Sequence, residues 1–140
     1  MEISRVLGID YGEKRVGLSI SDPSRIFAQT LCTVNRPRNG DQRVVEKIKE
    51  LVTRHEITEI VVGWPLRLNG KEGIQTQKVA RFIDQLSNLA LPIHKWDERL
   101  STTSADRVLS QAGVHGKARK QKVDQLAAVI ILQAWLDAQC

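Results

Sequence analysis

The chain has 140 residues, of which 41% are hydrophobic and 26% are charged. This composition excludes extended disorder, and the length predicts a single domain over residues 1–140. No apolar run approaches the roughly 20 residues of a membrane span, so we expect a cytoplasmic protein with no membrane partner. The 21 Lys and Arg residues outnumber the 16 Asp and Glu residues, and this excess of positive charge favours a polyanionic partner.

Cysteine and histidine do not predict a metal site or a disulfide. Cys32 lies in an apolar segment and Cys140 is the last residue, so we expect no structural bridge between them. The three histidines, His55, His94 and His115, lack any close ligand spacing. A bound metal ion would therefore be held by oxygen ligands.

The N-terminal segment predicts a β-hairpin that carries an aspartate. Ile3–Ile9 is mostly aliphatic and Val16–Ile20 alternates apolar with small residues, while Gly12 suits the turn between them. A carboxylate at the inner end of an apolar strand is costly unless it is paired, near solvent or bound to a cation. Asp10 is therefore a candidate functional residue, although an aspartate that only caps the turn fits the same position.

The middle of the chain predicts a change from an antiparallel meander to alternating helices and strands. Ala28–Val34 is expected as a third strand, and Gln42–His55 as an amphipathic helix that Asp41 caps. Glu59–Gly63 follows as a short buried strand, which indicates a parallel crossover. Ile74–Leu89 has the apolar spacing of another amphipathic helix.

Two polar loops carry cations. In the loop after the third strand, we interpret Arg36 and Arg38 as solvated turn residues. The loop Gly63–Gly73 follows a strand at the sheet edge where ligands gather, so it is a candidate binding element. In this loop we expect Trp64 to pack rather than to stack on a base. The residues suited to phosphate oxygens there are Arg67, Asn69 and Lys71.

A second acidic strand end follows. Ile93–Trp96 alternates as a last strand and ends on Asp97, Glu98 and Arg99. Asp97 and Glu98 point to opposite sides if the strand continues through them, so only one of them faces Asp10, and the pattern does not say which. Arg99 fits an ion pair with these carboxylates as well as it fits a substrate contact.

The C-terminal part predicts two helices joined by a basic loop. The helices are expected over Thr103–Ala112 and Val123–Ala138, and the second is apolar on most sides and therefore buried. We expect the loop Gly113–Lys122 to contact nucleic acid through its cations, which are Lys117, Arg119, Lys120 and Lys122. Asp124 then opens the last helix, where a cap is the ordinary role. Together with Asp10 and Glu98 it forms a plausible divalent-metal site.

Four ordered segments resemble the YqgF family, also called RuvX. The segments are G-I-D-Y-G-E-K-R-V-G-L-S, V-V-G-W-P-L-R-L-N-G, W-D-E-R-L-S-T and K-V-D-Q-L-A-A-V-I-I-L. The resemblance implies an α/β, RNase H-like fold with a mixed five-stranded sheet, a three-stranded antiparallel meander plus two parallel strands, flanked by helices. It also implies a nuclease that is similar to the Holliday-junction resolvases and that takes part in maturing the 5′ end of pre-16S rRNA.

The resemblance implies that Asp10, Glu98 and Asp124 are the catalytic residues and the ligands of Mg²⁺ or Mn²⁺. Asp97 is the substitute for Glu98. Two ions about 3.5–4 Å apart are the usual arrangement, with Asp10 as the bridging ligand. Lys14 and Arg15 are expected to steady the scissile phosphate. In related resolvases a carboxylate usually ends the fourth strand, but that strand ends on Gly63 and Trp64 here, so the role is moved to the fifth strand.

Alternative functions use the same residues. A DNA resolvase would act on a four-way junction and would need a dimer, for which no sequence feature is present. A non-catalytic RNA-binding factor of ribosome assembly would keep the acids as a vestige. The favoured partner is thus pre-rRNA, with branched DNA as the other candidate substrate and ribosomal precursor particles as a further candidate partner. A sugar-kinase or actin-like ATPase is disfavoured because 140 residues leave no room for a second lobe.

Overall fold

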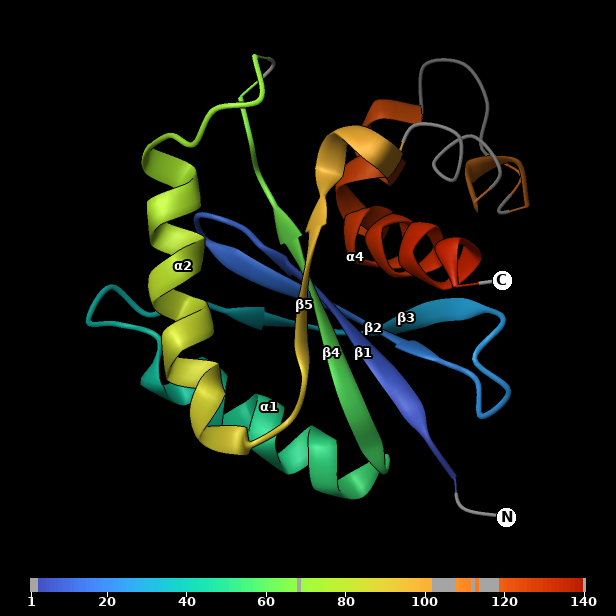
Figure 1. Ribbon diagram of the computed structural model, residues 1–140, viewed down its shortest axis with the longest axis horizontal. Coiled ribbons are helices and arrows are strands. Elements are labelled where there is room, and N and C mark those ends of the chain that lie inside the picture. The colour runs from blue at the N-terminus through green and yellow to red at the C-terminus, as the bar shows by residue number, and fades with distance from the viewer. Residues whose placement is uncertain (1–2, 68, 102–107, 112, 114–118, 140) are drawn as a thin grey trace.

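The computed structural model describes residues 3–67, 69–101, 108–111, 113 and 119–139. Its centre is a five-stranded sheet in the order β3-β2-β1-β4-β5 (Figure 1). The antiparallel meander consists of β1 (Arg5–Tyr11), β2 (Arg15–Ser21) and β3 (Ala28–Asn35). The parallel strands are β4 (Ile57–Trp64) and β5 (Ile93–Asp97). The mixed sheet expected from the sequence is therefore confirmed.

Helices cover both faces of the sheet. On one face lie α1 (Gln42–Arg54) and α2 (Ile74–Leu86), and on the other lies α4 (Arg119–Ala138) (Figure 1). Two short 3-10 helices, η1 (Ser87–Leu89) and η2 (Glu98–Ser101), flank β5 in the sequence. No helix in these described ranges combines the length and the apolar character needed to cross a membrane.

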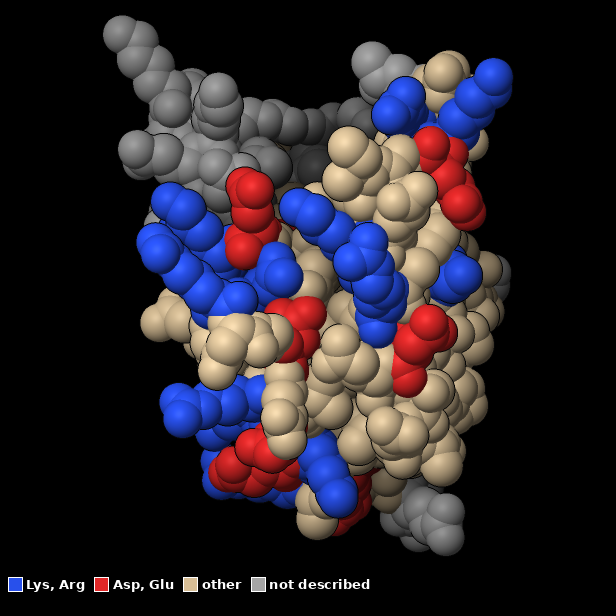
Figure 2. Space-filling model, turned by 90° about the vertical axis from the view of Figure 1, so that its left-hand side faces the viewer, with Lys and Arg blue, Asp and Glu red and all other residues tan. Residues whose placement is uncertain are grey.

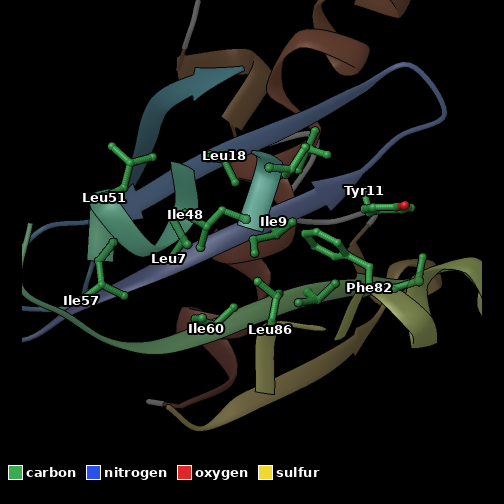
Figure 3. Close-up of a cluster of buried hydrophobic side chains, with 14 of the residues drawn as sticks. Leu7, Ile9, Tyr11, Leu18, Ile48, Leu51, Ile57, Ile60, Phe82 and Leu86 are labelled. Atoms are coloured by element: carbon green, nitrogen blue, oxygen red, sulfur yellow. The ribbon is translucent and has the colours of Figure 1, made fainter. Parts of the chain in front are cut away.

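Strand alternation divides the core between the two faces. Leu7, Ile9 and Tyr11 of β1 pack against α1 and α2, in the larger cluster that Figure 3 shows. Val6 of β1 instead joins a second cluster with α4, which includes Leu132. Because side chains alternate along a strand, Asp10 lies on the α4 face.

The C-terminal helix begins earlier than predicted. It starts at Arg119 instead of Val123, so Arg119, Lys120 and Lys122 belong to a helix and not to a loop. Its first turn has no acidic residue, and Asp124 comes later than the first-turn position predicted for it. Lys, Arg and Gln are good helix formers, so the polar residues before Val123 do not end a helix. Lys117 and most of the predicted helix Thr103–Ala112 lie outside the described residues, although 108–111 are helical.

Small residues let α4 approach the sheet closely. A Cβ at Gly8 would lie 2.3 Å from Ser19 Oγ and 2.7 Å from Leu132 Cβ. The buried Ser19 hydroxyl donates a hydrogen bond of 2.7 Å to the Ala128 carbonyl of α4. A Cβ at Gly17 would instead make ordinary contacts, 3.6 Å from Ala128 Cβ. The helix and the sheet are thus in closer contact at Gly8 than at Gly17.

We predict that Gly8→Ala destabilises the protein and that Gly17→Ala does not. The first variant pushes a methyl group into α4, and overpacking of this kind costs about 1–3 kcal/mol. Urea unfolding followed by circular dichroism measures both variants against the wild type. Equal unfolding free energies for the two glycine variants would contradict the close packing at Gly8.

Candidate active site

Asp10 stands on the α4 face of β1, next to small residues. Its partner in the antiparallel pair with β2 is Gly17, and a Cβ at that glycine would lie 3.8 Å from Asp10 Cβ. On the other side, Ile9 pairs with Val62 of β4, so Gly63 is the next residue of β4 beside Asp10. Glycine on both neighbouring strands leaves space around the Asp10 carboxylate, which is partly buried.

Glu98 occupies the space above Gly63. It is the first residue of η2, directly after β5. A Cβ at Gly63 would come within 2.5 Å of Glu98 Oε1 and 2.7 Å of Ile131 Cδ1 of α4. The carboxylate therefore lies between β4 and α4, on the same face of the sheet as Asp10. A side chain at Gly63 would displace it.

The two carboxylates are close enough to repel one another. Burial raises the pKa of Glu98 to about 7, and the neighbouring charges of Asp10 and then Asp97 contribute to this increase. A group that resists ionisation at neutral pH stabilises a proton or a cation at its position. Asp10 and Glu98 thus form a site that favours positive charge.

Asp97 is engaged elsewhere, which answers the question that the strand pattern left open. Its Oδ1 accepts hydrogen bonds of 3.0 Å from the backbone N–H and from Nε of Arg99. Arg99 Nη2 donates a third bond of 2.6 Å to Oδ2. These bonds from Arg99 hold the pKa of Asp97 below its usual value. Arg99 is therefore the ion-pair partner of Asp97, and Glu98 is the residue beside Asp10.

The third predicted acid lies in α4. Asp124 is four residues before Ala128, whose Cβ would contact a side chain at Gly17. The described residues contain no set of three or more Asp, Glu, His or Cys side chains arranged to hold a metal ion. The side chain of Asp124 is outside that description, so its part in the site stays a prediction.

The donor chemistry of the described pair fits a hard divalent cation. Mg²⁺ and Mn²⁺ take carboxylate oxygens as ligands. Asp10 and Glu98 supply such oxygens in a partly buried place, where burial and then the repulsion from Asp10 raise the pKa of Glu98 to about 7. A cation between them would remove that repulsion.

The loop after β4 is organised by its own hydrogen bonds. Asn69 Oδ1 accepts a bond of 3.0 Å from the Lys71 N–H, and the Arg67 N–H donates one of 2.9 Å to the Lys71 carbonyl. Asn69 therefore shapes the loop, whereas the side chains of Arg67 and Lys71 are exposed. Trp64 packs against the core with the Lys95 ammonium 4.2 Å above its ring. This confirms that Trp64 packs instead of presenting its ring to a base.

Arg36 was wrongly predicted as a solvated turn residue. Its Nη1 donates to the carbonyls of Gly12 and Glu13, at 2.8 and 2.9 Å, and its guanidinium lies 4.2 Å from the centre of the Tyr11 ring. Only 19% of its side chain is exposed. These contacts join segments more than 20 residues apart, so no local pattern predicts them.

Asp41 is also used differently from its predicted role. It stands at the N-cap position of α1 but makes no capping hydrogen bond with its side chain. Instead Oδ1 accepts a bond of 2.9 Å from Arg36 Nε, and Oδ2 accepts one from the Tyr11 hydroxyl. Arg36, Asp41 and Tyr11 therefore form a clamp that holds the turn after Asp10.

Solved structures identify the class of fold. Thermus thermophilus RuvC in complex with a Holliday junction substrate aligns with a TM-score of 0.65, over 97% of this chain and 95% of that one, at 14% identity. The fowlpox virus resolvase, also solved with Holliday junction DNA, aligns with a TM-score of 0.50 over 96% and 98% of the two chains, at 10% identity. The protein thus has the RNase H-like fold of these resolvases.

Sequence comparisons identify the family. The family model of RuvX, described as Holliday junction resolvase, matches residues 4–138. A relative from Syntrophus aciditrophicus is 47% identical, with 96% of this chain and 89% of the relative covered. Another from Thermoanaerobacter pseudethanolicus is 44% identical, with 96% and 97% covered. Both are named "Putative pre-16S rRNA nuclease". The chain therefore belongs to the RuvX family of nucleases.

We predict that Glu98→Gln stabilises the metal-free protein at pH 8 but not at pH 5. The folded state holds the Glu98 proton up to about pH 7, whereas the unfolded state releases it near 4.5. Stability is therefore lost as the pH rises between these values. Removing the charge should raise the free energy of unfolding by about 1–3 kcal/mol at pH 8. Thermal and urea unfolding in the presence of a chelator measure this change.

Asp97→Asn is the matched control for this experiment. Its carboxylate has a lowered pKa because Arg99 binds the charged form, so it stabilises the fold above its unfolded pKa and loses that effect in acid. The amide should therefore lower stability at pH 8. If Glu98→Gln lowered stability at pH 8 in the same way, the repulsion between Glu98 and Asp10 would be refuted.

Proposed function

We propose that the protein is a metal-dependent nuclease that hydrolyses phosphodiester bonds of pre-16S rRNA during maturation of its 5′ end. The observation that carries the proposal is the partly buried pair of Asp10 and Glu98, where burial, together with the neighbouring charges of Asp10 and Asp97, raises the pKa of Glu98 to about 7. The names of the relatives, which concern pre-16S rRNA, support the substrate. The expected surroundings are the cytoplasm and ribosomal precursor particles.

In this proposal Asp10, Glu98 and Asp124 hold Mg²⁺ or Mn²⁺. Bound divalent ions neutralise the phosphate, lower the pKa of a bound water and stabilise the leaving oxygen. Asp10 lies on the central strand β1, from which its carboxylate would supply oxygen ligands to the metal. Ile131 packs beside Glu98 and limits the access of water from that side.

Cations around the pair are proposed to bind the backbone of the substrate. Lys14 lies on the turn that follows β1 and Arg15 begins β2, and both side chains are exposed. Further contacts are proposed for Arg67, Asn69, Lys71, Arg99, Lys117, Arg119, Lys120 and Lys122. Arg99 would do this with the part of its guanidinium that Asp97 leaves exposed, since 39% of its side chain is accessible. Phosphate contacts of this kind position a strand without reading its sequence.

A four-way DNA junction is the second candidate substrate. The description of the RuvX family as Holliday junction resolvase favours it. It uses the same carboxylates, so only the substrate distinguishes the two activities. A third possibility, an assembly factor that binds RNA without cutting it, differs from both because its activity would not depend on Asp10.

We predict that the protein cleaves a pre-16S rRNA 5′-end fragment in Mg²⁺ or Mn²⁺ and that Asp10→Asn lowers the rate more than about 100-fold, as the loss of one charge-stabilising group does. The variant is nearly isosteric, so its fold should be retained. Asp84→Asn is the matched control, because Asp84 is exposed on α2. A four-way DNA junction is assayed in parallel.

The outcomes separate the three functions. RNA cleavage that needs metal and Asp10 supports the rRNA nuclease. Cleavage of the junction alone identifies a DNA resolvase. RNA binding without cleavage, equal in the wild type and in Asp10→Asn, points to an assembly factor and refutes the catalytic proposal.

We also predict that Mn²⁺ raises the melting temperature more at pH 8 than at pH 5.5. Metal binding must displace the proton from Glu98, whose pKa is about 7, so affinity rises with pH. Ligand binding to the folded state then appears as added stability. Differential scanning fluorimetry with increasing Mn²⁺ measures the shift, and Glu98→Gln should remove most of it. A shift of the same size at both pH values would argue against Glu98 as a ligand.

A further inference from the structure

A basic cavity of about 590 Å³ lies beside the candidate active site. Its walls are the turn between β1 and β2 and the loop between β3 and α1. The lining residues are Glu13, Lys14, Arg15, Asn35, Arg36, Pro37 and Arg38. Both loops lie on the left of Figure 1, on the side of the molecule that faces the viewer in Figure 2, where Lys and Arg side chains gather. Positive charge therefore dominates this cavity.

The walls of the cavity are held in place. Arg36 binds the carbonyls of Gly12 and Glu13 and the carboxylate of Asp41. Its backbone N–H donates a bond of 2.9 Å to the Lys14 carbonyl. The two loops are thus joined through both the side chain and the backbone of one residue. A cavity organised in this way before binding costs little ordering entropy when a ligand enters.

Three cations of the cavity are available to a ligand. Lys14, Arg15 and Arg38 are exposed, and in the described part of the chain none of them forms an ion pair. Arg36 differs, because its guanidinium is already bound to Asp41. Within the described residues, the charge of these three cations is therefore not neutralised by an ion pair.

The lining also indicates which part of a nucleic acid enters. No aromatic residue belongs to the lining, and the neighbouring Tyr11 ring is buried beneath the Arg36 guanidinium. A base would find no ring on which to stack, whereas phosphate oxygens would meet several donors. The chemistry thus fits the backbone and not the bases.

The cavity begins a short distance from Asp10 along the sheet. Asp10 pairs with Gly17, and Arg15 begins β2 two residues away, which is about 7 Å along a strand. A nucleic-acid strand bound at Asp10 therefore reaches the cavity within a short distance. The cavity is distinct from the acidic site, because neither Asp10 nor Glu98 belongs to its lining.

We propose that this cavity is a second phosphate-binding site, which holds the backbone of the substrate strand next to the cleavage position. The placement of the bound strand next to a cleavage position rests on the proposed function, but the binding of phosphates in the cavity does not depend on cleavage. Lys14, Arg15 and Arg38 contact the phosphates, and Arg36 is a positioning residue that keeps the two loops together.

The test measures binding of a single-stranded RNA in the Asp10→Asn background, where cleavage is expected to be strongly slowed. The double variant Arg15→Ala/Arg38→Ala should weaken binding at least about 10-fold. The slope of log K against log salt concentration should become less steep by about 1.4, since each phosphate contact on a single strand contributes about 0.7. The control Lys49→Ala/Arg81→Ala removes the same charge from exposed positions on α1 and α2. Circular dichroism checks that both double variants fold.

Three outcomes are decisive. Loss of affinity and salt slope in the cavity variant alone supports the proposal, even if the wild-type protein cuts nothing. Equal effects in both double variants overturn it, while the nuclease proposal would stand on its cleavage assay. Displacement of the RNA by millimolar inorganic phosphate, with the same dependence on Arg15 and Arg38, would identify a site for small anions and overturn the assignment to a nucleic-acid strand.

Discussion

Close packing of α4 against glycine positions of the sheet is the constraint on which the candidate site depends. At Gly8 there is no space for a Cβ between the strand and the helix. At Gly63 the space that a side chain would fill is taken by the Glu98 carboxylate and Ile131. The same shortage of side-chain volume thus allows the helix to cover the sheet and confines two carboxylates beneath it.

This confinement has an electrostatic consequence. Burial of the Glu98 carboxyl group disfavours its charged form and the nearby Asp10 charge adds to this effect, so the pKa of Glu98 rises to about 7. Asp97 shows the opposite behaviour one residue away, because Arg99 neutralises it. Because the pKa values of these adjacent residues shift in opposite directions, the fold concentrates negative charge at the Asp10 and Glu98 pair. A cost in stability that is concentrated in this way is typical of functional sites.

Positive charge lies on the loops that follow β1 and β4. Exposed cations are present on both loops, and the cavity beside the β1–β2 turn is held by the clamp of Arg36, Asp41 and Tyr11. The acidic pair suits a reaction at one phosphate, and the cations suit its neighbours. Membership in the RuvX family agrees with this division of charge, because a nuclease must hold a polyanion next to its own carboxylates.

The sequence by itself determined the parts that depend on local periodicity and on residue type. The five strands, the helices α1 and α2, the buried character of α4 and the candidacy of Asp10 follow from patterns within short windows. The tertiary structure alone decided that Glu98 and not Asp97 lies beside Asp10, that Arg36 and Asp41 clamp a turn, and that α4 begins at Arg119. The first two depend on contacts between residues far apart in the chain, and the third on a helix start that polar helix formers do not mark, so no local pattern contains them.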